Sequence, residues 1–459
     1  MRTLLLIIII ALTLAGCATY REMPLDKSAV DKALTPKSME AVRVQAKEIK
    51  HPVLKPVNFD DTDGLSPDEA AIMAVLVNPT LNSIRDQRGL AAAQLLQAGI
   101  LPNPQFSYSL DFPTGGNTQG TVNAFGLVFG WDVKSLITRG PKVDAARAKV
   151  ASVDLDVAWK EWQVAEGAKL HVYRLFFLGK QLAVAREEEA GLQNNRNAIK
   201  KAVDLGDMTL IDLAAAEAAL ETAHLSVLTT EHEQQKERLA LNQALGLPPE
   251  RVISLQQDIE VPPMQSLPSI TRIMDSIEEK RLDLLALRMG YQSQEALLRA
   301  AVRSQFPRIN IGLAHARDTS NVVTTGFSIG IEIPFFDRNQ GQIAIQKATR
   351  KQLFDEYINR LFDARASVAN ILADMESIKV QIKATEKTIA TLESLVQTYY
   401  KALLEGNADV LSYYNARNDL TSKQLEVIKL RRNLSDRYIA LEIAAGEYMG
   451  QTAGGEVHK

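Results

Sequence analysis

Apolar side chains alternate with small or polar ones in four short segments, and this period of two predicts four β-strands. In the first pair the apolar positions are Phe106, Tyr108, Leu110 and Phe112, then Phe125, Leu127, Phe129, Trp131 and Val133. In the second pair they are Ile309, Ile311 and Leu313, then Phe327, Ile329, Ile331 and Ile333. Polar turn formers separate the strands of each pair, PTGGNTQG from Pro113 and RDTSN from Arg317. The pattern fits strands of a transmembrane barrel, and it also fits hairpins of a soluble sandwich.

A second periodicity, with apolar residues stepping by three and four, predicts long helices that pack in pairs. After Leu361 it runs through Ala364, Val368, Ile371, Met375, Ile378, Ile382, Thr385, Ile389, Leu392, Val396, Tyr399 and Leu403. A repeat of about 3.5 residues indicates a left-handed coiled coil. The corresponding line of the first half is interrupted by His171, Glu189 and Arg196. Its helix, from about Pro141 to Leu205, has roughly 65 residues and a length of about 95 Å.

The two halves of the chain repeat the same order of elements, which predicts a duplicated domain of class α+β. Each half has a helix, a strand, a loop, a strand, a very long helix, a tight turn and a long helix. Gly206 and Gly406 lie where the paired helices turn back, at positions that favour a left-handed C-cap. After the first turn, Thr209-x-x-Asp212 forms a capping-box pattern that starts the next helix.

The N-terminus has the features of an export signal. Leu4 to Leu14 is an apolar stretch behind Arg2 and is too short to span a bilayer. The sequence Leu14-Ala15-Gly16-Cys17 resembles the bacterial lipoprotein cleavage box, in which the cysteine is acylated and the chain is cut just before it. An ordinary signal peptide with a stray cysteine is the alternative. Ala18 stands where an Asp would favour the inner membrane, so the outer membrane is expected.

These signals divide the chain into segments. They are a lipoprotein signal peptide at 1–16, a lipidated periplasmic segment of largely non-periodic sequence at 17–66, a first repeat at 67–246, an irregular proline-rich linker at 247–280, a second repeat at 281–446 and a C-terminal tail at 447–459.

The composition and the number of predicted strands exclude several classes of protein for this chain. The 52 Lys+Arg and 55 Asp+Glu give a formal charge of −3, which offers no electrostatic case for nucleic acid. A single cysteine excludes an internal disulfide framework and a thiolate metal cluster. No run reaches the roughly 20 apolar residues of a spanning helix. Spanning barrels start at about eight strands, so strands of this chain that cross a membrane need further chains to close the barrel.

The chain resembles the TolC-like outer-membrane efflux channel family over about residues 65–446. The resemblance is carried by LSPDEAAIMAVLVNPTL from Leu65, AGILPNP from Ala98, IPFFDRNQGQIA from Ile333 and the two glycine-centred helix turns. The second and third of these motifs look most similar to the heavy-metal efflux branch. The family implies a homotrimer in which four strands per chain complete a 12-stranded barrel in outer-membrane lipid, above a long periplasmic α-helical barrel. It also implies a periplasmic adaptor protein and an inner-membrane RND-type pump as partners.

The resemblance further implies roles for the helix turns. Gly206, Asp207, Gly406 and Asn407 would form the periplasmic tip and contact the adaptor. Asp212, Asp409, Ser412 and Asn415 would line the pore constriction. Ala408 stands where some relatives have an Arg that partners the gate, which speaks against a latch of that design. The alternative is that Asp207, Asp212 and Asp409 are N-terminal helix charges facing the macrodipole.

No catalytic constellation is present, so we expect no enzymatic activity, no cofactor and no metal site. The motifs G-x-S-x-G, H-E-x-x-H and the P-loop are absent. The DDTDG segment at Asp60 lacks the terminal Glu of a calcium loop. His224 and His232 are too far apart along a helix to share a ligand, and His171 is expected to make a register-setting polar contact in the helix seam.

The sequence thus predicts a lipid-anchored outer-membrane channel of a tripartite efflux system. Substrates would move passively through its water-filled lumen, with heavy-metal cations as the suggested class. Two alternatives remain at this point. One is the outer-membrane channel of a type I protein secretion system, and the other is a non-conducting periplasmic coiled-coil scaffold lipoprotein.

Overall fold

The computed structural model describes residues 19–60, 62–261, 269–405 and 407–449. The chain divides into two units, Met1–Ser38 and Met39–Lys459. The first unit contains helix α2 (Lys27–Leu34), where the Asp26 carboxylate accepts a hydrogen bond from the Ala29 amide. The predicted signal peptide and the lipidation site Cys17 lie outside the described residues.

The second unit contains two copies of one order of elements. The helices are α3 (Met39–Lys47), α4 (Pro67–Val77), α5 (Thr80–Gly99), α6 (Lys134–Leu205), α7 (Leu210–Ala244), α8 (Ile270–Lys280), α9 (Leu282–Arg303), α10 (Gln340–Leu404) and α11 (Val410–Ala445). The strands are β1 (Gln105–Asp111), β2 (Ala124–Asp132), β3 (Arg308–Arg317) and β4 (Val323–Glu332). The order α4–α5–β1–β2–α6–α7 recurs as α8–α9–β3–β4–α10–α11, which confirms the predicted duplication.

The four strands form one antiparallel sheet in the order β1-β2-β3-β4. The register pairs Tyr108 with Leu127, Phe129 with Leu313, and Leu313 with Phe327. Because partners in register lie on the same side of a sheet, the alternating apolar residues of all four strands share one face. The two hairpins of the duplicated halves are therefore joined side by side through β2 and β3.

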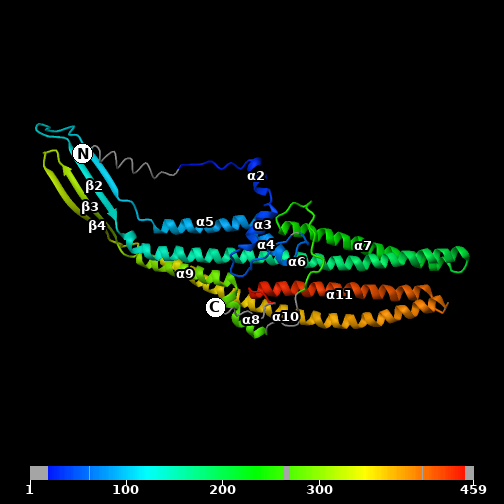
Figure 1. The fold of residues 1–459 in the computed structure, drawn as a ribbon. Helices are drawn as coiled ribbons and strands as arrows, with labels where there is room; N and C mark the ends of the chain where they lie inside the picture. The colour runs from blue at the N-terminus through cyan, green and yellow to red at the C-terminus, as the bar shows by residue number, and fades with distance from the viewer. Residues whose placement is uncertain (1–18, 61, 262–268, 406, 450–459) are drawn as a thin grey trace, which may run out of the picture. The chain divides into compact units, whose positions relative to one another are not determined.

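Long helices extend from the sheet and pair with each other in the second unit (Figure 1). Helix α6 has 72 residues, a length of about 110 Å at 1.5 Å per residue, and it contacts α7, α9 and α11. Helix α10 pairs with α11, and every predicted seam position from Ala364 to Leu403 is buried or half-buried. The seam therefore holds the hairpin together. Among the described residues, no helix is both long enough and apolar enough to cross a membrane.

Three expectations from the sequence need correction. Helix α6 begins at Lys134, directly after β2, rather than near Pro141, so the buried Pro141 lies inside the helix, where it removes one backbone hydrogen bond without ending the helix. The segment 247–280 is not irregular throughout, since Ser269 caps helix α8 and its residues Ile273 and Ile277 are buried on one face. The segment 17–66 contains the short helices α2 and α3, which each have too few turns for a long periodic pattern.

Candidate functional site

The two faces of the sheet differ in the size and polarity of their side chains. One face, here called the apolar face, carries large side chains that remain exposed, such as Phe106 at 67 % and Phe327 at 64 %. The other, the small face, carries chiefly glycine, serine and alanine, for example Ser107, Gly130 and Ser328. A sheet of a water-soluble sandwich would bury its apolar face against another layer, but within the described chain nothing covers this one.

The edges of the sheet are also open. Strand β1 pairs only with β2, and strand β4 pairs only with β3, in the part of the chain that the structure describes. An edge strand presents a row of free backbone N–H and C=O groups, which in lipid must be paired by another strand. The sheet of one chain is therefore incomplete as a membrane-spanning structure.

At the opposite end of the long helices, the turn between α6 and α7 follows the predicted geometry. Gly206 has φ of +86°, the left-handed conformation, and its N–H donates to the Val203 carbonyl at 3.0 Å. The Asp207 amide donates to the Ala202 carbonyl at 2.9 Å. Thr209 and Asp212 form the predicted capping box, in which each side chain accepts the backbone amide of the other residue.

The turn between α10 and α11 has a related geometry. Gly406 lies outside the described residues, whereas the Asn407 amide donates to the Ala402 carbonyl at 2.8 Å. The Asp409 carboxylate caps α11 by accepting the Ser412 amide at 2.7 Å and the Ser412 hydroxyl at 2.8 Å. These hydrogen bonds hold the pKa of Asp409 below its ordinary value of 3.8.

The structure brings the two predicted tips together. Val410, Tyr413 and Tyr414 of α11 share one apolar cluster with Ile199 of α6 and Ala216 of α7. Beside this cluster, a groove of about 430 Å³ runs between the α6–α7 hairpin and α11, and Asn415 is among its lining residues. The carboxylates of Asp212 and Asp409 are occupied with capping, as the alternative interpretation of these residues expected. Their place in a pore constriction stays a prediction.

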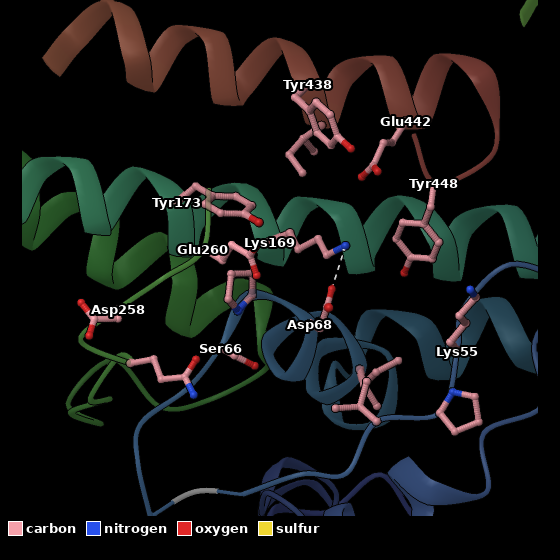
Figure 2. A pocket seen from close by; sticks show the side chains of 16 residues that line it. Lys55, Ser66, Asp68, Lys169, Tyr173, Asp258, Glu260, Tyr438, Glu442 and Tyr448 are labelled. Atoms are coloured by element: carbon pink, nitrogen blue, oxygen red, sulfur yellow. Dashed lines mark ion pairs between the residues drawn. The ribbon is translucent and has the colours of Figure 1, made fainter. Parts of the chain in front are cut away.

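A charged cluster that the sequence analysis missed lies where α4, α6 and α11 meet, beside a cavity of about 740 Å³ (Figure 2). The Lys169 ammonium lies 2.9 Å from Asp68, 3.7 Å from Glu166 and 4.3 Å from the centre of the Tyr448 ring. Glu442 of α11 also lines the cavity, and one of its oxygens accepts the Met449 amide at 2.9 Å. The cluster therefore connects three helices and the segment that follows α11.

Burial determines the protonation of this cluster. Glu166 is fully buried and Glu442 is 3 % exposed, and this burial raises the pKa of both carboxyls. Burial opposes the charge on Lys169, but the neighbouring Glu166 and the other acids raise the pKa of Lys169 overall. Both Glu166 oxygens are buried, and the nearby Glu442 carboxyl raises the pKa of Glu166 further, so a protonated carboxyl is the form that this site favours. The only sign of this charged cluster in the sequence is an acidic residue on a helix face that is otherwise apolar.

A second buried network fixes the segment before α4. The Nδ1 atom of His51 accepts the amides of Val53 at 3.1 Å and Leu54 at 2.9 Å, so Nε2 carries the proton and donates to the Ala158 carbonyl at 2.9 Å. Glu161 lies 3.9 Å from Nε2 and accepts from the Arg85 Nε at 2.6 Å. Burial lowers the pKa of His51, which keeps its ring neutral.

Two further histidines, His171 and His224, form pairs with acids. His171 meets Glu237 at 2.7 Å, the kind of polar contact in the helix seam that the sequence predicts. His224 meets Glu189 at 2.6 Å. In the segment that resembled a calcium loop, Asp60 accepts hydrogen bonds from Thr62, and Asp61 lies outside the described residues. Within the described ranges, no group of three or more His, Cys, Asp or Glu residues is placed to hold a metal.

Comparison with known proteins gives consistent matches. Residues 273–447 match the family described as outer membrane efflux protein. The cation efflux system protein CusC of Escherichia coli O157:H7 is 24 % identical over 280 residues, and the probable outer membrane lipoprotein SilC of Salmonella typhimurium is 22 % identical over 280. In both cases the alignment covers 58 % of this chain and 60 % of the relative, less than two thirds of its length. The toxin and drug export protein A of Aggregatibacter actinomycetemcomitans is 19 % identical and covers 94 % of this chain and 95 % of that protein.

The fold also matches a solved structure. A crystal structure of CusC, reported in connection with transmembrane channel formation, superposes with a TM-score of 0.69 at 19 % identity. The match covers 87 % of this chain and 98 % of that chain. The sheet, the paired long helices and their duplicated order are those of the TolC-like fold, and the matched family is not one of enzymes. The chain therefore has the TolC-like fold, and its residues 273–447 are similar to the outer membrane efflux protein family.

Proposed function

We propose that this chain, together with two further copies of itself, forms the outer-membrane channel of a tripartite efflux system. The observation that carries the proposal is the sheet at the end of the long paired helices, whose apolar face and two edges are left open by the described residues. In the trimer, β4 of one chain pairs with β1 of the next, so that no edge meets lipid. The apolar face then contacts lipid and the small face lines a water-filled lumen.

The remaining parts of the chain fit this arrangement. Cys17, acylated at the mature N-terminus, anchors the chain to the outer membrane, and the name of the relative SilC, an outer membrane lipoprotein, supports this anchor. The turns at Gly206–Asp207 and Gly406–Asn407 form the periplasmic tip, which contacts an adaptor protein joined to an RND-type pump. Asp212, Asp409, Ser412 and Asn415 line the constriction at this tip.

Two substrate classes have support from the names of relatives. CusC is named for cation efflux, which favours heavy-metal cations, the class suggested by the sequence. The toxin and drug export protein A matches over nearly the whole chain, and its name favours export of toxins or drugs, which keeps the type I secretion channel as the second candidate. A metal substrate needs no tight site in the channel, because deep binding would slow passage.

The test combines a channel measurement with a phenotype. Purified acylated protein is reconstituted in planar bilayers, and its migration in gels is compared before and after heating. We expect single-channel conductance and a trimer that dissociates only on heating. A non-conducting scaffold lipoprotein would give neither result, and either of these absences would contradict the proposal. Sensitivity of a deletion strain to metal salts, compared with its secreted proteins, then separates metal efflux from type I secretion.

A further inference from the structure

The small face of the sheet is uncharged along most of its length. Between its two ends, the small-face positions of β2, β3 and β4 carry glycine, alanine, serine, threonine, asparagine and Val128. Charged residues return at the end nearest the helices, where Asp132 of β2, Arg308 of β3 and Glu332 of β4 lie on this face. Side chains of short reach leave the middle of the face without any fixed charge, so selection by charge is confined to its ends.

At the end of the small face nearest the helices, basic and acidic side chains are equal in number. Arg308 and Glu332 are partners in the register, and the Arg308 Nε lies 3.7 Å from a Glu332 carboxylate oxygen. Both side chains are largely exposed, at 62 % and 67 %. They line a polar cavity of about 430 Å³, and its other charged residues are Asp132, Lys134, Lys142 and Asp337. Three acids therefore face three bases at this junction.

We propose that Arg308 sets the charge balance of the pore where the sheet meets the helices, so that this point admits solutes of either sign. This inference rests on the proposed channel function, in which the small face lines the lumen. Arg308 is the base that the sheet itself contributes, and its loss leaves Asp132, Glu332 and Asp337 against Lys134 and Lys142, an excess of carboxylates repeated in each copy. A ring of carboxylates concentrates cations and repels anions, as in cation channels.

The competing explanation is a structural ion pair between β3 and β4. Exposed pairs of this kind contribute little to stability, and removing one would leave the passage of ions unchanged. The two explanations differ in one readout, the ratio of cation to anion permeability. Unit charges about 7 Å apart in water interact with an energy close to RT, so the loss of one charge per chain changes this ratio at least about threefold.

The experiment measures reversal potentials of the reconstituted full-length protein under a KCl gradient. We expect Arg308→Gln to raise the ratio of K⁺ to Cl⁻ permeability at least about threefold, Glu332→Gln to lower it, and the double variant to return it near the wild-type value. Arg317→Gln is the matched control, because Arg317 lies on the same strand but on the apolar face. It should leave the ratio unchanged.

Equal ratios for wild type, Arg308→Gln and Glu332→Gln would overturn the inference while leaving the channel proposal intact. Absence of conductance in the wild type would instead overturn the channel proposal, and the inference would fall with it.

A second measurement is independent of conductance. A side chain at Gly330 has room beside Asn310, so Gly330→Cys places a thiol near Arg308 and Glu332 in detergent-solubilised protein. The rate at which this thiol reacts with a cationic reagent is divided by its rate with an anionic reagent. We expect this ratio to be higher when Arg308→Gln is combined with Gly330→Cys than in Gly330→Cys alone, and an unchanged ratio would contradict the inference.

Discussion

Two buried carboxyls at the junction of α4, α6 and α11 make the stability of the protein depend on pH. Burial raises the pKa of Glu166 above its ordinary 4.5, so the protonated form is favoured in the folded state. A group of this kind contributes stability that is complete below about pH 4.5 and is lost as the pH rises through the folded-state pKa. Glu442 has a raised pKa from the same cause and acts in the same direction.

Glu166→Gln should therefore flatten the pH dependence of stability, because an amide resembles the protonated carboxyl at every pH. We expect the variant to exceed wild type in unfolding free energy by about 1 kcal/mol or more at pH 8, and to differ less at pH 5. Chemical denaturation of the detergent-solubilised protein measures this difference. Glu187→Gln is the control, since Glu187 is exposed on the same helix. Parallel pH curves for wild type and Glu166→Gln would contradict the prediction.

His51 acts in the opposite direction. Burial lowers its pKa from 6.5, and its ring accepts two amides at Nδ1, which a protonated ring could not do. The stability that the neutral His51 ring contributes is present above about pH 6.5 and is lost as the pH falls through the folded-state pKa of His51. The charged groups that act on this ring are Glu161, which raises its pKa, and Arg88 and Arg85, which lower it.

Limited proteolysis should show this effect in the segment that His51 holds. We expect cleavage within residues 48–57 to increase between pH 7.5 and pH 5 in the wild type. His51→Ala leaves the Val53 and Leu54 amides without their acceptor, at a cost of about 1–3 kcal/mol, and should be cleaved readily at both pH values. If wild-type cleavage did not change with pH, His51 would not control the attachment of this segment.

At the scale of elements, the turns between the paired helices need a particular backbone conformation, and they are also the proposed periplasmic tip. Gly206 needs a positive φ, which proline cannot adopt, and its N–H is a hydrogen-bond donor. Gly206→Pro should therefore abolish export, because it displaces the start of α7, while leaving trimers intact through the distant sheet. The same result is expected for Gly406→Pro. Export assays and gel migration of the unheated protein measure the two properties.

The control for the helix turn is Gly89→Ala, at a position where an added Cβ meets nothing within 4 Å. It should export normally. Normal export by both proline variants would remove the tip assignment, and loss of trimers along with export would show that the turn serves assembly rather than docking.

At the scale of the whole molecule, the two faces of the sheet should respond differently to charge. Phe327→Glu places a carboxylate on the apolar face, where a charge near the middle of a bilayer is destabilising, by less than the about 2–4 kcal/mol of an Arg or Lys. Gly326→Glu places the same group one residue away on the small face, where an added Cβ has open space. We expect heat-modifiable trimers in the outer-membrane fraction from Gly326→Glu and few or none from Phe327→Glu. Equal yields would contradict lipid contact at the apolar face.

The sequence by itself determined the elements whose signal is local or periodic. Alternation placed the strands within a few residues, because each side chain of a strand reports its own face. The stepping from Ala364 to Leu403 gave the buried face of α10, since a paired helix repeats its contacts every three or four residues. Thr209, Asp212 and the conformation of Gly206 followed from turn chemistry, which needs only neighbouring residues.

Only the tertiary structure decided features that depend on which distant elements meet. Helix α3 was missed because its nine residues are too few to set a period. Helix α8 does place Ile270, Ile273, Met274 and Ile277 at helical spacing, but it follows a proline-rich segment, and the partners of both helices lie elsewhere in the chain. The cluster joins Lys169 and Glu166 of α6 to the distant Asp68 and Glu442, and each alone looks like an ordinary helix charge. The pairing of β2 with β3 placed Asp132 and Arg308 at one end of a common face. Interactions between charges and the burial of side chains depend on distances in the folded chain. The order of residues along the sequence does not give these distances, so only the tertiary structure decides them.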